Sequence, residues 1–139
     1  MTDLLLVDTS VYNRARHSAV VEAWAREASL DRVAVTPPAK LEILYSTRSA
    51  DEYAEVAEEL GAFRQVPCGQ DAGQRALDVQ AALARKGGLQ HRSVGFADLL
   101  IAAAAELAGA TVWHYDSDYD RIAEVTGQPT EWVAPRGSL

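Results

Sequence analysis

Four carboxylates stand where this chain is otherwise apolar: Asp8, Glu42, Asp98 and Asp116. Two of them directly follow short apolar runs, Asp8 after residues 4–7 and Asp116 after residues 111–115, and the other two interrupt stretches typical of buried helix. Aspartate and glutamate are almost never fully buried unless they are paired or bound to a metal. Acids in these positions therefore predict a site that holds a cation.

Such a cluster of acids is costly unless a cation is present. Two unit charges about 4 Å apart repel by roughly 4 kcal/mol at an effective dielectric constant of about 20. Without a cation, some of the carboxyls should keep their protons, with raised pKa values. A ligand set made only of oxygens favours a hard ion, Mg²⁺ or Mn²⁺, over zinc. The hydroxyl of Thr9 or Ser10 can add a further oxygen to the metal or to its water.

Short apolar segments alternate with helical patterns along the chain. Strands are expected over residues 4–7, 32–35, 63–67, 111–115 and 131–133. Helices are expected from Val11, with Thr9 or Ser10 as the cap, from Pro37 after a Thr36 cap, and over residues 51–60, 71–86, 96–107 and 118–125. Strands that alternate with helices imply right-handed crossovers and a parallel sheet. The predicted fold is a single α/β/α sandwich with a central, mostly parallel sheet flanked by helices.

This fold would bring the acids to one place. In open parallel sheets, sites form at the carboxyl ends of the strands, and Asp8 and Asp116 each follow a strand. Asp98 falls in the first turn of the 96–107 helix, where the helix dipole favours an anion. Glu42 falls one turn into the helix after the second strand. All four side chains can therefore reach one pocket from four separate elements.

Taken singly, the acids have ordinary explanations as well. Asp8 can cap the following helix, Glu42 can form a surface ion pair, and Asp116 can belong to a turn. Asp98 is harder to explain in this way, because its neighbours in residues 96–100 are apolar and leave it few partners. The metal site is therefore predicted from the four acids jointly.

Composition limits the class of protein. The 139 residues are 48% hydrophobic and 24% charged, as in one globular domain, and no apolar run reaches membrane-spanning length. The N-terminus lacks the basic segment of a signal peptide, and the single cysteine, Cys68, rules out an internal disulfide and argues against a Cys-based zinc site. These features predict a cytoplasmic protein. The net charge of −7 disfavours generic nucleic-acid binding but does not exclude a metal-dependent nuclease, because all basic residues except Lys40 and Lys86 are arginines suited to phosphate.

Other signals indicate no competing chemistry. Residues 116–120 begin like a calcium loop, but Arg121 replaces the required glycine and no glutamate closes the loop. A Gly-rich phosphate loop is missing, so a nucleotide cofactor is not expected. His114 lies inside a strand pattern and is expected to be a core or rim residue rather than a ligand.

The motifs, taken in order, resemble those of the PIN-domain ribonucleases and, more narrowly, of the VapC toxins of bacterial toxin–antitoxin pairs. The motifs are Val7-Asp8-Thr9-Ser10, Glu42, residues 97–104 (Ala-Asp-Leu-Leu-Ile-Ala-Ala-Ala) and residues 114–122 (His-Tyr-Asp-Ser-Asp-Tyr-Asp-Arg-Ile). The resemblance covers essentially the whole chain, as a PIN domain over residues 1–134 and a tail over residues 135–139. No single motif is specific, but the ordered set is.

The resemblance implies a Mg²⁺- or Mn²⁺-dependent endoribonuclease that cleaves structured RNA, typically tRNA or ribosomal RNA. Asp8, Glu42, Asp98 and Asp116 match the catalytic acids of the family. Asp118 matches an additional acid, so the metal ligands implied are Asp8, Asp98, Asp116 and Asp118. Ser10 matches the family's small hydroxyl residue and is placed with the substrate-binding residues. The family also implies a homodimer, inhibited by a VapB-type antitoxin whose C-terminal segment occupies the active site, without any membrane association.

Site chemistry indicates metal-activated attack of water on a backbone phosphate. Arg92, in the loop before the Asp98 helix, is a candidate for holding the substrate phosphate, although a solvated loop arginine is an equally good interpretation. Two alternatives remain: a PIN scaffold that binds RNA or protein without cleaving it, and a Mg²⁺-binding receiver-like phosphoacceptor domain. The second needs a lysine at a late strand end, where neither Lys40 nor Lys86 lies.

Overall fold

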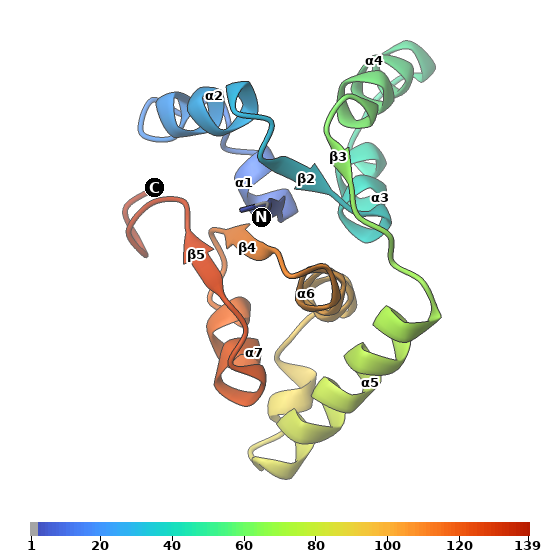
Figure 1. The fold of residues 1–139 in the computed structure, drawn as a ribbon, viewed down its shortest axis with the longest axis vertical. Helices are drawn as coiled ribbons and strands as arrows, with labels where there is room; N and C mark the ends of the chain where they lie inside the picture. Colours follow the sequence, from blue (N-terminus) through green and yellow to red (C-terminus); the bar gives the residue numbers. More distant parts are fainter. Residues whose placement is uncertain (1–2) are drawn as a thin grey trace.

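The computed structural model describes residues 3–139, and within them a five-stranded sheet carries helices on both faces (Figure 1). The strands are β1 (Leu5–Val7), β2 (Val33–Val35), β3 (Arg64–Gln65), β4 (Thr111–His114) and β5 (Thr130–Trp132). The helices are α1 (Thr9–Tyr12), α2 (Val21–Ser29), α3 (Pro37–Tyr45), α4 (Ala50–Gly61), α5 (Gln70–Arg85), α6 (Phe96–Ala108) and α7 (Asp118–Thr126), with a short 3-10 helix, η1 (Gln90–Arg92), before α6.

The strand order is β3-β2-β1-β4-β5, and every neighbouring pair in the described sheet is parallel. This confirms the predicted α/β class with a parallel sheet. Leu6 pairs with Val112 and Val7 with Trp113, so β1 and β4 end side by side. The sheet therefore brings the residues that follow these two strands to the same edge.

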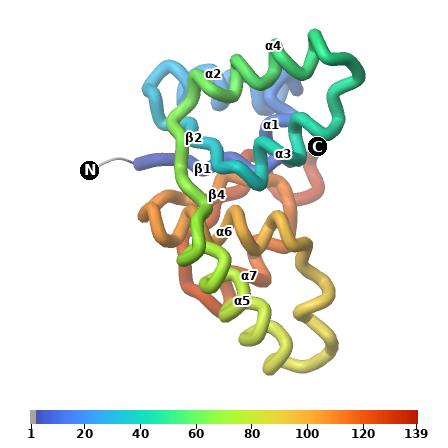
Figure 2. Tube along the Cα trace, turned by 90° about the vertical axis from the view of Figure 1, so that its right-hand side faces the viewer, coloured from blue at the N-terminus to red at the C-terminus, as the bar shows by residue number. Residues whose placement is uncertain are grey.

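Successive strand residues point to opposite faces and supply two separate cores. Leu6 and Val112 pack with buried residues of α5, α6 and α7, whereas Val7 and Trp113 pack with α1, α3 and α4 and with partly buried residues of α2. In Figure 2, α2 and α4 lie above the strands and α5, α6 and α7 below them. The two cores fix the sheet between two helical layers, as in the predicted sandwich.

One predicted helix cap is wrong and one is confirmed. The first helix begins at Thr9 rather than near Val11, and its cap is Asp8, whose side chain accepts a hydrogen bond from the Ser10 N–H. At α3 the N-cap is Thr36, as predicted, but its side chain makes no cap hydrogen bond, and its Oγ1 is buried without a partner among residues 3–139. Pro37 and Pro38 account for this, since they remove two of the N–H groups at the start of the helix.

The α6 helix is covered in its middle and uncovered at its ends. Residues 101–105 are each buried, as the apolar sequence predicts. Phe96 and Leu107 are 81% and 55% exposed, so the prediction of a helix covered all round is wrong for its two ends. The exposed Phe96 lies two residues before Asp98 and next to the site described below.

Within the part of the chain that the structure describes, no helix combines the length and the apolar character that crossing a membrane requires. The start of the predicted domain at residue 1, and part of the N-terminal segment considered for a signal peptide, lie outside the described residues.

Candidate metal centre

Three of the predicted acids converge at the carboxyl edge of the sheet. One carboxylate oxygen each from Asp8, Asp98 and Asp116 lies within 4.8 Å of the other two. Asp8 directly follows β1 and its N–H donates to the Trp113 carbonyl, 3.0 Å away, which ties it to β4. Asp116 follows β4 after one residue, and Asp98 is in the first turn of α6, which packs beside β4 in Figure 1.

Asp8 is the most deeply buried of the three, with 3% of its surface exposed. Its Oδ2 accepts hydrogen bonds from the Ser10 N–H at 3.0 Å and from the Ser10 hydroxyl at 2.5 Å. Its Oδ1 accepts one from the Tyr119 hydroxyl at 2.6 Å. Asp8 is thus both a helix cap and a member of the acidic cluster, so the two interpretations of this residue do not exclude each other.

Tyr119 is a site residue that sequence reasoning did not identify. It is fully buried on α7, and its hydroxyl lies 3.2 Å from Asp98 Oδ1 in addition to its contact with Asp8. A buried tyrosine normally finds a hydrogen-bond partner for its hydroxyl. Its position between Asp118 and Asp120, at the apolar register of a short helix that also buries Ile122, was the available signal.

The pKa values of two acids in the cluster are raised, as expected for acids that lie close together without a cation. The pKa of Asp98 is raised from 3.8 to about 8, first by burial and then by the charge of Asp8, by a hydrogen bond with Asp118 and by the charge of Asp116. The pKa of Asp116 is also raised, mainly by burial. A divalent cation would remove this repulsion, and oxygens are the ligands that hard cations prefer. The residues present therefore fit Mg²⁺ or Mn²⁺.

His114 accepts a hydrogen bond from the backbone of Asp116 and is not directed at the acidic cluster as a ligand. The Asp116 N–H donates to His114 Nδ1 at 3.1 Å, and the buried imidazole packs against the rings of Tyr119 and Trp132, with centroids 4.9 Å away in both cases. Burial lowers the pKa of His114, so the ring is neutral, with its proton on Nε2. This confirms the prediction of a core histidine.

Glu42 does not join the three converging acids. It is exposed on α3, and its Oε1 accepts a hydrogen bond from the Thr9 hydroxyl at 2.9 Å. Because Thr9 follows Asp8, Glu42 lies at the margin of the site rather than in its centre. Its predicted catalytic role stays a prediction.

Asp118 also lies at the margin of the site. Its N–H donates to Asp116 Oδ1 at 2.9 Å, and its Oδ1 is 2.8 Å from a guanidinium nitrogen of Arg121. Arg121 therefore already neutralises part of its charge. Whether Asp118 ligates a metal stays a prediction.

The two residues predicted to bind substrate lie in different surroundings. The Ser10 hydroxyl donates to Asp8 and accepts from the Tyr115 N–H at 2.9 Å, so its contacts lie within the acidic site. Arg92 is exposed on η1, in the segment that leads into α6. A second arginine, Arg14, was not singled out from the sequence: it donates to the Ser10 carbonyl at 2.9 Å, and its guanidinium stacks 4.7 Å from the centre of the Tyr115 ring.

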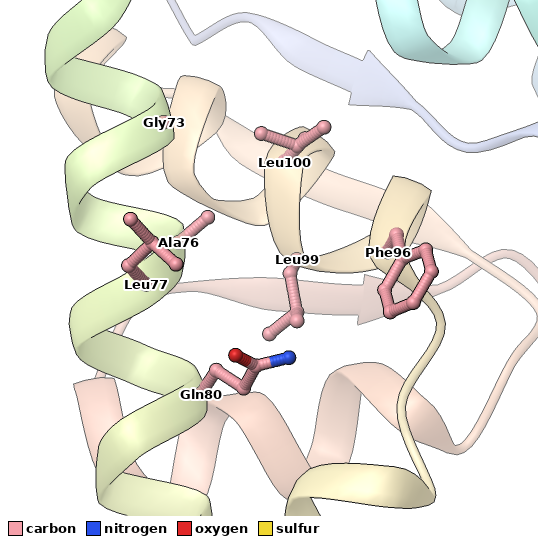
Figure 3. A pocket seen from close by; sticks show the side chains of 7 residues that line it. All are labelled: Gly73, Ala76, Leu77, Gln80, Phe96, Leu99 and Leu100. Carbon is pink, nitrogen blue, oxygen red and sulfur yellow. The ribbon is translucent and has the colours of Figure 1, made fainter.

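An apolar hollow of about 150 Å³ opens between α5 and α6. Figure 3 shows the side chains that line it: Gly73, Ala76, Leu77, Gln80, Phe96, Leu99 and Leu100. Gln80 is the only polar side chain in this lining. The hollow can therefore accept an apolar side chain, and it lies on the same helix as Asp98.

Comparisons with known proteins identify the family of this chain. Residues 5–125 match the PIN domain family. The Mycobacterium tuberculosis protein named Ribonuclease VapC18 is 50% identical to this chain over 133 residues, 96% of this chain and 97% of that protein. The structure of DNA-bound VapBC from Salmonella typhimurium aligns with a TM-score of 0.75 and 20% identity, over 96% of this chain and 100% of that chain. VapBC-5 from Mycobacterium tuberculosis aligns with a TM-score of 0.60 and 26% identity, over 94% of this chain and 97% of that chain. As the resemblance of its motifs predicts, the chain belongs to the PIN domain family and, within it, to the VapC ribonucleases.

Proposed function

We propose that this chain is the toxin of a VapBC-type toxin–antitoxin pair, a Mg²⁺- or Mn²⁺-dependent endoribonuclease that cleaves structured RNA such as tRNA or ribosomal RNA. The observation that carries the proposal is the convergence of Asp8, Asp98 and Asp116 in a chain that is 50% identical to a named ribonuclease. A cytoplasmic location fits such a substrate.

Asp8, Asp98 and Asp116 would hold the ion. When bound, the ion supplies Lewis-acid chemistry, activating water toward a phosphodiester and offsetting the negative charge that develops on the phosphate. Ser10 and Tyr119 orient the Asp8 carboxylate, and the neutral His114 fixes the backbone of Asp116. Glu42, hydrogen-bonded to Thr9 at the margin of the site, would contact the attacking water or the RNA rather than the ion.

Arginines near the site would bind the RNA backbone, because a guanidinium matches phosphate geometry. Arg14 is held by the Ser10 carbonyl and by the Tyr115 ring, which places it beside the acids in an ordered position. Arg92 is exposed at the entrance to α6. We assign the phosphate-binding role to these two residues together.

The partner we propose is a VapB-type antitoxin. The solved structures that align with this chain include VapBC complexes. A basic side chain of the antitoxin, entering the acidic site, would supply the positive charge that the three carboxylates lack. The apolar hollow between α5 and α6, which Phe96 and Leu99 of the Asp98 helix help to line, would accept an apolar residue of the antitoxin.

We also propose a homodimer. Leu41 and Tyr45 are 68% and 92% exposed on the same face of α3, and we assign the contact between the two copies to this face. Sedimentation equilibrium of wild type and of a Tyr45→Arg variant tests it, since the variant should sediment as a monomer and an unchanged dimer would exclude this face.

Purified, antitoxin-free protein incubated with total cellular RNA tests the proposed activity. Discrete fragments are expected with Mg²⁺ or Mn²⁺, and none in Asp8→Asn or Asp98→Asn. Asp71→Asn, an exposed acid on α5, is the matched control and should cut like wild type. A folded wild-type protein that binds RNA and cuts none in the presence of metal would instead support the non-cleaving scaffold.

A further inference from the structure

The Asp8 carboxylate has most of its hydrogen-bonding capacity occupied. An ionised carboxylate offers about four acceptor positions, two on each oxygen. The Ser10 N–H and hydroxyl both donate to Oδ2, at 3.0 and 2.5 Å, and the Tyr119 hydroxyl donates to Oδ1 at 2.6 Å. One acceptor position, on Oδ1, is therefore left for any further partner.

The donors that occupy the other positions are themselves held in place. The Ser10 hydroxyl accepts from the Tyr115 N–H at 2.9 Å, which directs its own proton toward Asp8. Tyr119 is fully buried, and its ring packs against the buried ring of His114. These contacts hold the Ser10 hydroxyl and the Tyr119 ring beside Asp8, and both side chains thereby orient its carboxylate.

From this geometry we infer that Ser10 and Tyr119 are positioning residues that restrict Asp8 to one free ligand oxygen, and that this restriction makes the site prefer Mg²⁺ or Mn²⁺ to Ca²⁺. The inference rests on the proposed metal-dependent function. Calcium takes six to eight oxygens and often binds carboxylates through both oxygens, whereas magnesium demands a small, near-octahedral set. A carboxylate confined to one oxygen serves the smaller ion better.

The carboxylates of the two neighbouring acids, Asp98 and Asp116, also lie beside hydrogen-bond donors of the protein. Asp116 Oδ1 accepts a hydrogen bond from the Asp118 N–H at 2.9 Å, and Asp98 Oδ1 lies 3.2 Å from the Tyr119 hydroxyl. Asp8 and Asp116 thus each have at least one oxygen engaged within the protein. Asp8 is the extreme case, because both of its oxygens are engaged.

Removing either donor should release Asp8, and removing the Ser10 hydroxyl should also change which ion the site prefers. Tyr119→Phe keeps the buried ring and frees the second position on Oδ1, so that the carboxylate can rotate. Ser10→Ala independently frees a position on Oδ2. Loss of such supporting contacts commonly weakens metal binding about 10-fold. We expect that loss for Mn²⁺ in both variants. In Ser10→Ala the position freed on Oδ2 gives Ca²⁺ a second oxygen, so the preference for Mn²⁺ should fall about 10-fold in that variant.

The test measures binding and needs no RNA. The Kd for Mn²⁺ is obtained from the electron paramagnetic resonance signal of free Mn²⁺, and the Kd for Ca²⁺ from competition against it. Tyr12→Phe is the matched control, because the Tyr12 hydroxyl lies beside Glu59, outside the cluster. Circular dichroism and thermal unfolding establish that each variant is folded, and Ser10→Ala provides the measurement if Tyr119→Phe is not.

A Ca²⁺-to-Mn²⁺ Kd ratio that falls in Ser10→Ala, and stays at the wild-type value in Tyr12→Phe, supports the inference, with weaker Mn²⁺ binding in Tyr119→Phe. Equal weakening of both ions in Ser10→Ala overturns it and leaves the proposed metal site standing. Failure of the wild type itself to bind Mn²⁺ overturns the metal site and, with it, this inference.

Discussion

Asp8 and Asp98 face one and the same hydroxyl group, that of Tyr119, whose oxygen lies 2.6 Å from Asp8 Oδ1 and 3.2 Å from Asp98 Oδ1. A phenol has one proton to donate, and the shorter contact assigns it to Asp8. Asp98 is left without that donor. Its pKa is raised mainly by burial and then by the neighbouring acids Asp8, Asp118 and Asp116, and several measurable outcomes follow.

The stability of the metal-free protein should fall as pH rises. The pKa of Asp98 is raised from its ordinary value of 3.8 to about 8 in the folded protein, so between these values the folded state holds a proton that the unfolded state releases. Stability then decreases with increasing pH across this window, because ionising Asp98 costs more in the folded protein. Thermal unfolding in EDTA between pH 5 and pH 8 should show the decline, and Asp98→Asn should flatten it. An equally steep decline in Asp98→Asn would contradict this explanation.

Divalent metal should reverse that loss of stability. A ligand that binds only the folded state adds about 2.7 kcal/mol at a concentration of 100 times its Kd. The melting temperature at pH 8 should therefore rise with Mn²⁺ in the wild type and in Asp71→Asn. Differential scanning calorimetry of Asp8→Asn should show no such rise, since that variant removes a central ligand. A full rise in Asp8→Asn would place the bound metal elsewhere.

Glu42 should affect cleavage more than metal binding. It is exposed and contacts Thr9 rather than the three converging carboxylates. In Glu42→Gln we expect kcat to fall about 100-fold, within the range of general acid–base effects, while the Kd for Mn²⁺ stays near the wild-type value. Single-turnover cleavage and Mn²⁺ titration separate the two effects. A large loss of Mn²⁺ affinity would make Glu42 a metal ligand instead.

Arg14 and Arg92 should contribute to RNA affinity through phosphate contacts. Each contact removed should lower the slope of log K against log salt by about 0.7 to 0.9. Fluorescence anisotropy with a labelled RNA, in an Asp98→Asn background that cannot cut, measures the slope for Arg14→Ala and Arg92→Ala. Arg64→Ala is the control, because that guanidinium is paired with Asp31 on the β3 side of the sheet. An unchanged slope in Arg92→Ala would mean that Arg92 is an ordinary surface residue without a phosphate contact.

Much of the site can be predicted because the ends of the strands can be recognised in the sequence. Asp8 and Asp116 follow apolar runs that can only be buried strands, and parallel pairing of β1 with β4 then brings them together. Asp98 is predicted by the same reasoning, since an acid in an apolar helix needs a partner. The PIN domain resemblance and the parallel sheet are confirmed on this basis.

The rest of the site depends on side-chain packing that no spacing rule specifies. In the sequence, Tyr119 is one more aromatic residue of an amphipathic helix. Only the packing of α7 in the fold brings its hydroxyl into contact with Asp8. Glu42 lies at the right place along α3, but its direction depends on how α3 packs against α1 and α6. The cap at α1 was misjudged because Asp8 fills two roles, and sequence reasoning considered them as alternatives.

The central claim is that Asp8, Asp98 and Asp116 bind one divalent ion that RNA cleavage requires. The most direct test is the rate of cleavage of one defined RNA as Mn²⁺ is added back to EDTA-treated, desalted protein. We expect no cleavage before Mn²⁺ is added, and half-maximal activation at a Mn²⁺ concentration equal to the Kd measured on the same protein. Cleavage at full rate in the presence of EDTA, with Mn²⁺ binding lost, would contradict it.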